Sequence, residues 1–222
     1  LTGVRVLDLS LFLPGPHLTM MMADHGAEVI KIEPYPHGEP ARHAPYKKAG
    51  HSVWFRNTNR GKKSVRLNLK DARGKEILLQ LAAKADVFVE SFRPGVLDRL
   101  GVGYAAVAAR APQIIYCSIS AFGQTGRYSK KPAHDHAIQA MAGVSSVSLG
   151  RDGFPAMPGV AAGDMAGSLM ALNGILMALI KQRSTGKGDY IDLAMHDALL
   201  AWTPHVLGPV FAEQRDPIPQ QE

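Results

Sequence analysis

The sequence predicts an α/β fold in which helices cover both faces of a doubly wound parallel β-sheet. Three observations predict it. Short β-branched and apolar runs alternate with helix-like segments along the chain, as in parallel sheets. The first two such runs and the segment between them fill about thirty residues, the size of a minimal strand–helix–strand unit. The length of 222 residues is sufficient for one large domain with a substantial core.

Proline and glycine divide the first part of the chain into recognisable elements. Residues 4–9 (VRVLDL) and 28–32 (EVIKI) predict strands. Between them, residues 14–16 (PGP) predict a turn, and the apolar segment that follows predicts a helix closed by Gly26. Residues 33–62 contain four prolines and predict a long irregular loop, and loops of that length are usually functional.

The remaining elements follow the same alternation. Residues 64–69 predict a strand, and Asp71 is expected to cap a helix that runs to about Ala85. Further strands are predicted over residues 86–90, 113–120 and 190–195, with a short helix before residue 113, a helix over 134–142, a long apolar helix from Asp164 to near Gln182, and an apolar helix after the last strand. This alternation predicts the doubly wound sheet.

The composition is that of an ordinary soluble globular chain and excludes several classes of protein. Hydrophobic residues make up 46% and charged residues 20%, which excludes disorder, collagen and coiled coil. The single cysteine, Cys117, excludes a disulfide framework within the chain and cannot form a zinc cluster by itself, so no metal site is expected. The longest uncharged stretch of the apolar C-terminal half, residues 165–180, is short for a membrane span, and no signal peptide is visible. We therefore expect a cytoplasmic protein without a membrane partner.

Positive charge is concentrated in one segment, residues 42–75, which we call the basic segment. It contains eleven lysines and arginines and one acidic residue, Asp71, although the net charge of the whole chain is only +6. Such an excess predicts a positive surface that binds an anion, or else a solvated surface without a ligand. Zinc-finger, RNP and helix-turn-helix signatures are missing, so we expect no nucleic-acid partner. A phosphorylated small molecule fits the basic segment at least as well.

Three short motifs and the single cysteine predict no function on their own. Residues 101–106 (GVGYAA) match a dinucleotide-binding pattern but follow a helical turn rather than a strand. Residues 186–187 (GK) lack the upstream glycine and the following Ser or Thr of a P-loop. Residues 134–136 (HDH) have no further cluster of metal ligands to support them. Cys117 lies in an apolar strand and is interpreted as an inert core thiol.

Two residues remain as candidate catalytic groups. Asp164 follows Gly163 at the start of the long helix and could be only an N-cap. A carboxylate at that point can, however, be approached closely by a substrate, and the backbone N–H groups of the helix start could hold a developing oxyanion. His134 lies at a loop-to-helix junction, where a histidine could equally be structural or simply exposed.

The motifs taken together resemble the family III (CaiB/BaiF) CoA-transferases, a superfamily that includes the α-methylacyl-CoA racemases. The resemblance covers essentially the whole chain. It rests on LTGVRVLDLSLFLPGP, GAEVIKIE, NRGKKSVRLNLKD, ADVFVESFRPGVLDRLGVGY, ISAFGQTG, PAHDHAIQAMAG, GDMAGS and RSTGKGDYIDLAMHDA. Each motif alone would be weak, but the combination is specific.

The resemblance implies a Rossmann-like large domain over residues 1–222 and an interlocked homodimer. It also implies acyl-CoA and a small carboxylic acid as substrates, with no tightly bound cofactor. Because the family's chains are considerably longer, the C-terminal part of the family fold is absent here. The chain is accordingly interpreted as the N-terminal portion of a larger protein, or as an incomplete sequence.

Several residues match functional positions of the family. Asp164 matches its catalytic carboxylate. At two other positions the chain departs from the transferases: Pro34 stands where Arg is common, and Ser91 stands where Asn is common. Phosphate contacts are therefore expected from elsewhere in the basic segment. The positions that contact CoA in relatives are Leu67, Lys70, Phe92, Arg99 and Met195.

Two reactions of this superfamily remain open. In a transferase, Asp164 would attack the thioester as a nucleophile. In a racemase, His134 and Asp164 would remove and return the proton α to the thioester carbonyl, and these residues match the racemase pair in type and spacing. The sequence that follows His134 resembles the transferases, so a CoA-transferase is the predicted function and a racemase the alternative. A non-enzymatic binding module is a third possibility, but it leaves the GDMAGS and PAHD motifs unexplained.

Overall fold

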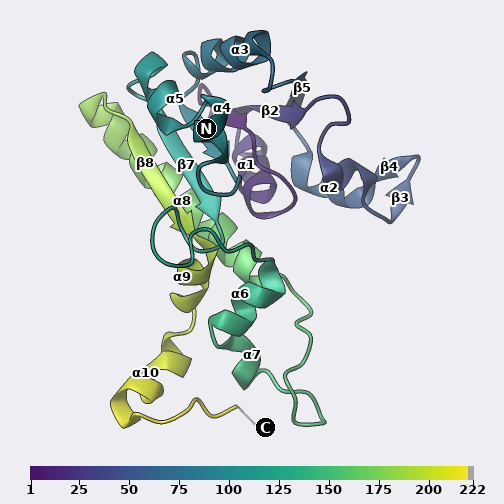
Figure 1. Ribbon diagram of the computed structural model, residues 1–222, viewed down its shortest axis with the longest axis vertical. Helices are drawn as coiled ribbons and strands as arrows, with labels where there is room; N and C mark the ends of the chain where they lie inside the picture. Colours follow the sequence, from purple (N-terminus) through teal and green to yellow (C-terminus); the bar gives the residue numbers. More distant parts are fainter. Residues whose placement is uncertain (220–222) are drawn as a thin grey trace.

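The computed structural model describes residues 1–219 and contains a six-stranded parallel sheet (Figure 1). The chain builds outward from the first strand to one edge and then returns to the strand's other side. The order of the strands therefore reverses between β1 and β6, and the predicted doubly wound parallel sheet is confirmed. In spatial order the strands are β5 (Lys63–Leu67), β2 (Glu28–Pro34), β1 (Arg5–Asp8), β6 (Val87–Glu90), β7 (Ile115–Ser120) and β8 (Asp189–Ala194).

Helices cover both faces of this sheet. Because successive residues of a strand point to opposite faces, Val87 and Val89 of β6 join the core on one face and Phe88 joins the core on the other. Two-sided burial explains why the central strands are continuous apolar runs. The first core is covered by α1 (Pro14–Asp24) and α8 (Ala162–Thr185), and the second by α3 (Ala72–Ala82), α4 (Val96–Leu100) and α5 (Tyr104–Arg110).

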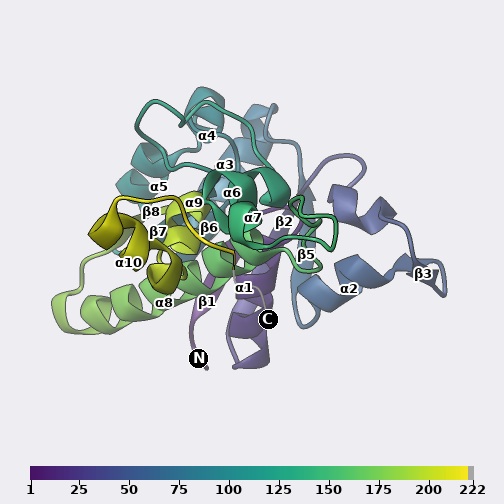
Figure 2. The same cartoon turned by 90° about the horizontal axis from the view of Figure 1, so that it is seen from below.

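Shorter elements extend from the sheet on two sides. Figures 1 and 2 show a group of short helices close to the point at which β8 continues into α9. Figure 1 shows a hairpin and a short helix on another side of the sheet, next to β2 and β5, in the connection between these two strands. The helical group is α6 (Asp135–Met141), α7 (Val144–Val147), α9 (Met195–Leu200) and α10 (Pro204–Glu213); the connection contains η1 (Pro40–His43), β3 (Lys47–Lys48), β4 (His51–Ser52) and α2 (Val53–Asn59).

Two local predictions are wrong. Residues 14–16 do not form a turn but the first turn of α1, where proline is tolerated because the N–H groups have no partner within the helix. The connection between β2 and β5 is not irregular throughout. Its three prolines, Pro36, Pro40 and Pro45, all precede residue 46, whereas Pro34 ends β2. The chain beyond them forms the hairpin and α2. The Ser52 side chain caps α2 by accepting a hydrogen bond from Phe55 N at 3.2 Å.

The helix α8 is longer than predicted and begins two residues before Asp164. By length and composition alone it is long and apolar enough to cross a membrane. A single helix of this kind is weak evidence for a membrane span, since the apolar helix of a protein core meets the same test. In the structure α8 packs on the sheet face that it shares with α1, where Ala171 and Ile175 are fully buried.

Candidate active site

The site is located by the point at which the strand order reverses. In open α/β sheets, ligands bind outside the carboxyl ends of the strands at such a point. Here the loop that follows β1 and the loop that follows β6 lie next to each other, and Leu11 N donates a hydrogen bond of 3.0 Å to Ser91 Oγ. Ser91 is one of the two positions at which the chain departs from the transferases, and its hydroxyl joins these two loops.

A cluster of four buried charges lies beneath the β1 loop. The side chains of Asp8, Lys31, Glu39 and Lys62 are each at most 1% exposed. Lys31 Nζ lies 2.6 Å from Glu39 Oε2, and Lys62 Nζ lies 2.9 Å from Asp8 Oδ2. The two positive charges balance the two negative ones, which is the condition for burying ionised groups in a core.

This cluster fixes the conformation of the β1 loop. Asp8 Oδ1 accepts a hydrogen bond of 2.9 Å from Ser10 N, and Glu39 Oε1 accepts one of 2.8 Å from Phe12 N. Phe12 has a φ of 64°, a left-handed conformation that is unusual for a bulky residue. The bond to Glu39 holds the backbone in that conformation. Lys31 Nζ adds a bond of 2.8 Å to the carbonyl of Ser10.

Asp164 is the third residue of α8 and is half-buried. Its side chain makes no capping hydrogen bond to the helix, so it is not the N-cap; that position belongs to Ala161. Burial and the neighbouring Asp135 carboxylate raise the pKa of Asp164 to about 6. The carboxyl group is thus still mostly ionised at neutral pH, but it is more basic than an exposed aspartate.

The backbone N–H groups at the start of α8 are bonded to Asp135. Asp135 Oδ1 accepts hydrogen bonds from Gly163 N at 2.8 Å and from Asp164 N at 3.0 Å. The next donor, Met165 N, bonds to Ala161 O at 2.9 Å within the helix. The expectation that these groups stabilise an oxyanion is therefore wrong for this conformation, because protein acceptors already occupy them.

A further contact links α8 to the start of α1, which follows the β1 loop. His17 Nδ1 lies 2.9 Å from Ser168 Oγ, one helical turn after Asp164. Burial and the charges of Arg60 and Lys62 lower the pKa of His17. The neutral imidazole is therefore favoured, and the contact fixes the start of α1 against α8.

His134 immediately precedes Asp135 and is the N-cap residue of α6. Its side chain is exposed, and within residues 1–219 it makes no capping hydrogen bond. The structure therefore places His134 at the α6 end that contacts the first turn of α8, but without a fixed partner for its ring.

The predicted CoA contacts lie on both faces of the sheet. Leu67 ends β5, Lys70 is exposed in the following loop, and Phe92 follows β6 with its N–H bonded to Glu90 Oε2 at 2.7 Å. Arg99 is exposed on α4. These four residues border the carboxyl ends of β5 and β6.

Met195 lies apart from the other predicted CoA contacts, on the α8 face. It begins α9 and is 9% exposed. A Cβ atom on Gly167 would approach Met195 Cγ to 2.7 Å. The helices α8 and α9 therefore pack too closely at this point for a residue larger than glycine at position 167. The five predicted positions thus extend from β5 to the helix that contains Asp164.

The basic segment is less positive than its sequence predicts. Lys62 is buried against Asp8, Arg42 pairs with Glu33, and two further residues pair with acids outside the segment: Arg60 with Asp24 and Lys63 with Glu28. Within residues 1–219 the other seven cations form no ion pair: Lys47, Lys48, Arg56, Arg66, Lys70, Arg73 and Lys75.

Glu90 is a buried acid that no local sequence motif marks as functional. It ends β6, accepts a hydrogen bond from Phe92 N, and also accepts one from Ser118 Oγ of β7. Burial raises the pKa of Glu90 to about 7, with smaller contributions from Asp98 and Asp192. Glu90 therefore joins the loop that contains Phe92 to the neighbouring strand.

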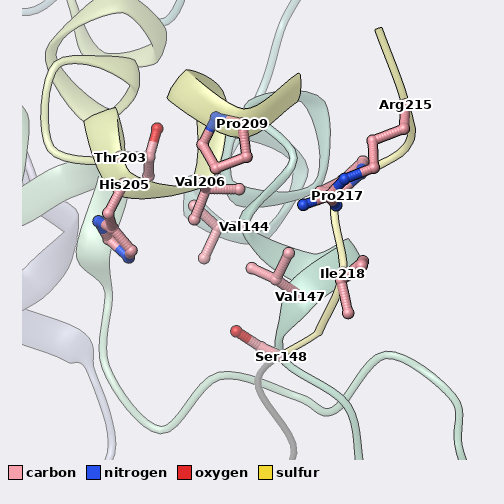
Figure 3. A pocket seen from close by; sticks show the side chains of 10 residues that line it. All are labelled: Val144, Val147, Ser148, Thr203, His205, Val206, Pro209, Arg215, Pro217 and Ile218. Atoms are coloured by element: carbon pink, nitrogen blue, oxygen red, sulfur yellow. The ribbon is translucent and has the colours of Figure 1, made fainter. Parts of the chain in front are cut away.

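A pocket of about 320 Å³ lies away from these residues, between α7, α10 and the segment that follows α10 (Figure 3). Figure 3 shows side chains of all three facing one cavity. Neither Asp164 nor His134 lines it, and neither do the predicted CoA contacts. Its lining consists of Val144, Val147, Ser148, Thr203, His205, Val206, Pro209, Arg215, Pro217 and Ile218.

Two further sequence interpretations can be compared with the structure. Cys117 is fully buried in β7, and burial raises the pKa of its thiol well above the usual range, which confirms an inert core cysteine. Residues 101–103 lie between α4 and α5 rather than after a strand, which confirms that the glycine motif is not a dinucleotide-binding loop. Within residues 1–219 no group of three or more His, Cys, Asp or Glu side chains could hold a metal ion.

Comparison with known proteins assigns the family. The model of CoA-transferase family III matches residues 1–222. The chain is 44% identical over 207 residues to acetyl-CoA:oxalate CoA-transferase of Acetobacter aceti, covering 92% of this chain and 53% of that protein. It is 41% identical over 217 residues to succinyl-CoA:glutarate CoA-transferase of Mus musculus, covering 97% of this chain and 50% of that protein.

A solved structure gives the same result. The crystal structure of a CAIB/BAIF family protein from Brucella suis superposes with a TM-score of 0.93 at 34% sequence identity, covering 99% of this chain and 59% of that one. The chain spans about half the length of the curated relatives it matches. Its sequence, its sheet and its match to the family model agree, and the chain belongs to CoA-transferase family III.

Proposed function

We propose that this protein transfers CoA from an acyl-CoA thioester to a carboxylic acid, with Asp164 as the nucleophile. One observation carries the proposal: a half-buried carboxyl group with a pKa of about 6 lies at the start of α8, held by Asp135. The similarity to an acetyl-CoA:oxalate and a succinyl-CoA:glutarate CoA-transferase supports this class of reaction.

The reaction requires only acyl transfers. The Asp164 carboxylate attacks the carbonyl carbon of the donor thioester, the C–S bond breaks, and the CoA thiolate leaves behind a mixed anhydride. The thiolate then attacks the Asp164 carbonyl of the anhydride, which releases the donor acid and leaves an aspartyl-CoA thioester. The acceptor carboxylate attacks this thioester and expels the thiolate. Finally, the thiolate attacks the acceptor carbonyl, which forms the new acyl-CoA and regenerates the Asp164 carboxylate.

The surroundings of Asp164 suit this role. A carboxylate whose pKa is about 6 is ionised at neutral pH and more nucleophilic than one with an ordinary pKa. Partial burial removes part of the water that would otherwise hydrolyse an anhydride. The pair of loops joined by Leu11 and Ser91 lies at the carboxyl end of the sheet, the end at which α8 begins.

The CoA moiety would lie along the carboxyl ends of β5 and β6 and reach α8. Lys70 and Arg99 are exposed cations with no ion-pair partner within residues 1–219, and they would contact phosphate oxygens. Leu67, Phe92 and Met195 would supply apolar contacts. His134 would position the acyl thioester rather than act as an essential base.

We further propose that the protein forms an interlocked homodimer in the cytoplasm, without a nucleic-acid or membrane partner. Two apolar side chains of α8 support a larger assembly, since Met177 is 64% and Ile180 is 70% exposed in this chain. Further protein, from the same or a second chain, would cover them. Light scattering coupled to size-exclusion chromatography of the full-length protein tests the dimer.

The proposed reaction is tested with a panel of substrates. The full-length protein is incubated with acetyl-CoA or succinyl-CoA and with carboxylates such as oxalate and glutarate, and the CoA products are identified by mass spectrometry. New acyl-CoA species that require both substrates support a transferase. Proton exchange at Cα of a 2-methylacyl-CoA without new CoA esters would instead establish a racemase. Neither product in any combination would contradict both enzymatic assignments.

A further inference from the structure

The side chain of Asp135 makes the contacts that hold the start of α8. Asp135 is 9% exposed, and its Oδ1 accepts hydrogen bonds from Gly163 N at 2.8 Å and Asp164 N at 3.0 Å. Its Oδ2 accepts a bond of 2.6 Å from Gln139 Nε2. Both carboxylate oxygens are therefore used, and two of the backbone donors that a helix start leaves unpaired are satisfied by one side chain.

We propose that Asp135 is a positioning residue that holds the backbone of Asp164, and hence its carboxyl group, in the orientation required for attack on the thioester. The inference rests on the proposed function. Asp135 itself needs no contact with substrate, since it acts through the first turn of α8. It differs from an ordinary helix cap because one of the two N–H groups that it binds belongs to the nucleophile itself.

The surrounding residues reinforce this arrangement. Gln139 Nε2 also donates a hydrogen bond of 3.0 Å to Val160 O, so α6 holds the segment before α8 as well as the helix start. Gly163 permits the close approach. A Cβ atom at this position would lie 3.0 Å from Ile138 Cγ2 and 3.1 Å from Asp135 Oδ1, closer than such contacts usually are. Close packing against α6 thus explains why a glycine precedes Asp164.

The charge of Asp135 has a second consequence. Negative charge is stabilised at a helix N-terminus, and a lone carboxyl group in the first turn would have its pKa lowered. Asp135 opposes that effect, since its charge and the burial of the site together raise the pKa of Asp164 to about 6. The adjoining elements also contain His134 and His136 at the α6 end, and His17 of α1, which contacts Ser168. The helix α9, which packs on α8 and α6, adds His196 and Asp197.

Two substitutions separate geometry from charge. Asp135→Asn keeps an oxygen that accepts from the two backbone N–H groups but removes the charge. The Gln139 amide can turn to offer its oxygen to the new Nδ2, and it then loses its hydrogen bond to Val160 O. Asp135→Ala removes both the accepting oxygen and the charge. The matched control is Asp86→Ala, since Asp86 Oδ2 also accepts a hydrogen bond from a backbone N–H group, that of Arg5 at 2.8 Å, but at the amino end of β1 and away from the site.

The experiment measures kcat, the KM for acyl-CoA and the pH profile of the full-length variants. We expect Asp135→Ala to lower kcat between about 10- and 100-fold, as misplaced catalytic groups do, with KM changed by less than about 2-fold. Asp135→Asn should retain more of kcat and should move the acid limb of the kcat profile to lower pH. Asp86→Ala should leave kcat and the profile unchanged.

The outcomes distinguish this inference from the proposed function. A wild-type protein without transferase activity, or an Asp164→Ala variant that keeps it, would contradict the proposed function. A wild type whose activity depends on Asp164, combined with an unchanged kcat in Asp135→Ala, would contradict the positioning role alone. If Asp135→Ala does not fold, Asp135→Glu decides: it keeps the charge, but its longer side chain displaces the carboxylate from the two backbone N–H groups, so an unchanged kcat in this variant would contradict the positioning role.

Discussion

Lys62 Nζ lies 2.9 Å from Asp8 Oδ2, although the two residues are 54 positions apart in the sequence. Lys62 also donates hydrogen bonds to Pro16 O at 2.8 Å and to Asn59 Oδ1 at 2.9 Å. A lysine of the basic segment thus connects the end of β1, the first turn of α1 and the end of α2. Its role is to hold the site together rather than to attract a ligand.

Loss of the Lys62 charge should destabilise the fold strongly. Lys62→Met keeps most of the side-chain volume but leaves Asp8 with only Lys31, whose Nζ is 3.6 Å away. We expect the free energy of unfolding at pH 7 to fall by about 3–5 kcal/mol, the usual cost of removing one partner of a buried pair. Chemical denaturation measures the change.

The adjacent lysine provides the control. Lys63 pairs with Glu28 at the surface and its side chain is 71% exposed. Lys63→Met should change the free energy of unfolding by less than about 1 kcal/mol, because exposed ion pairs contribute little. Equal losses in the two variants would show that the buried cluster has no special role.

Glu90 should make stability depend on pH near neutrality. Its folded-state pKa is raised to about 7 by burial, so protonation favours the folded state. The resulting stability is fully present below the unfolded pKa of about 4.5 and is lost as pH rises through 7. Relative to Glu90→Gln, the wild type should lose about 2–3 kcal/mol between pH 5 and pH 8. Denaturation curves at several pH values measure this difference, and a parallel pH dependence in the two proteins would contradict it.

The exposed cations Lys70 and Arg99, at the carboxyl ends of β5 and β6, should bind CoA. Lys70→Ala and Arg99→Ala should each weaken CoA binding between about 10- and 100-fold, the value of a charge-assisted hydrogen bond, and the affinity of the wild type should fall with salt. Isothermal titration calorimetry measures these affinities. Lys63→Ala is the matched control and should bind CoA as the wild type does. An oligonucleotide that binds more tightly than CoA at physiological salt would overturn this prediction.

His134 distinguishes the two reactions of the superfamily. Its exposed ring at the start of α6 has no fixed partner, so we expect His134→Ala to lower the transfer rate but to leave CoA exchange between acids measurable. Transfer is followed by mass spectrometry in H₂O, and α-proton exchange is followed in D₂O. Deuterium that appears at Cα of a 2-methylacyl-CoA and disappears in His134→Ala would assign the residue to a racemase.

The sequence predicts the sheet well and the buried charges poorly. Strands such as residues 86–90 are continuous apolar runs bounded by turn residues, and local pattern is enough to locate them. Asp8, Lys31 and Lys62 are single charges near or within such runs. Their pairing depends on which strands become neighbours, and that information is absent from local sequence. The only local signal was a charge inside an apolar strand, as at Lys31.

The candidate site shows the same division. The GDMAGS motif and the helix pattern located Asp164, but the carboxylate that caps its helix comes from a segment 29 residues earlier. Asp135 lies between His134 and His136, a local pattern that indicates at most a metal motif. The basic segment is less positive than its composition predicts because the acids that neutralise it, such as Glu33 and Asp24, lie outside it in the sequence.

We predict that Asp164 becomes covalently modified during turnover. The full-length enzyme is loaded with acyl-CoA, treated with hydroxylamine or borohydride, and digested for peptide mass spectrometry, with Asp164→Ala as the inactive control. We predict a hydroxamate or a reduced side chain at Asp164 in the wild type alone. An unmodified Asp164 peptide, from a sample in which turnover is confirmed, would contradict the account.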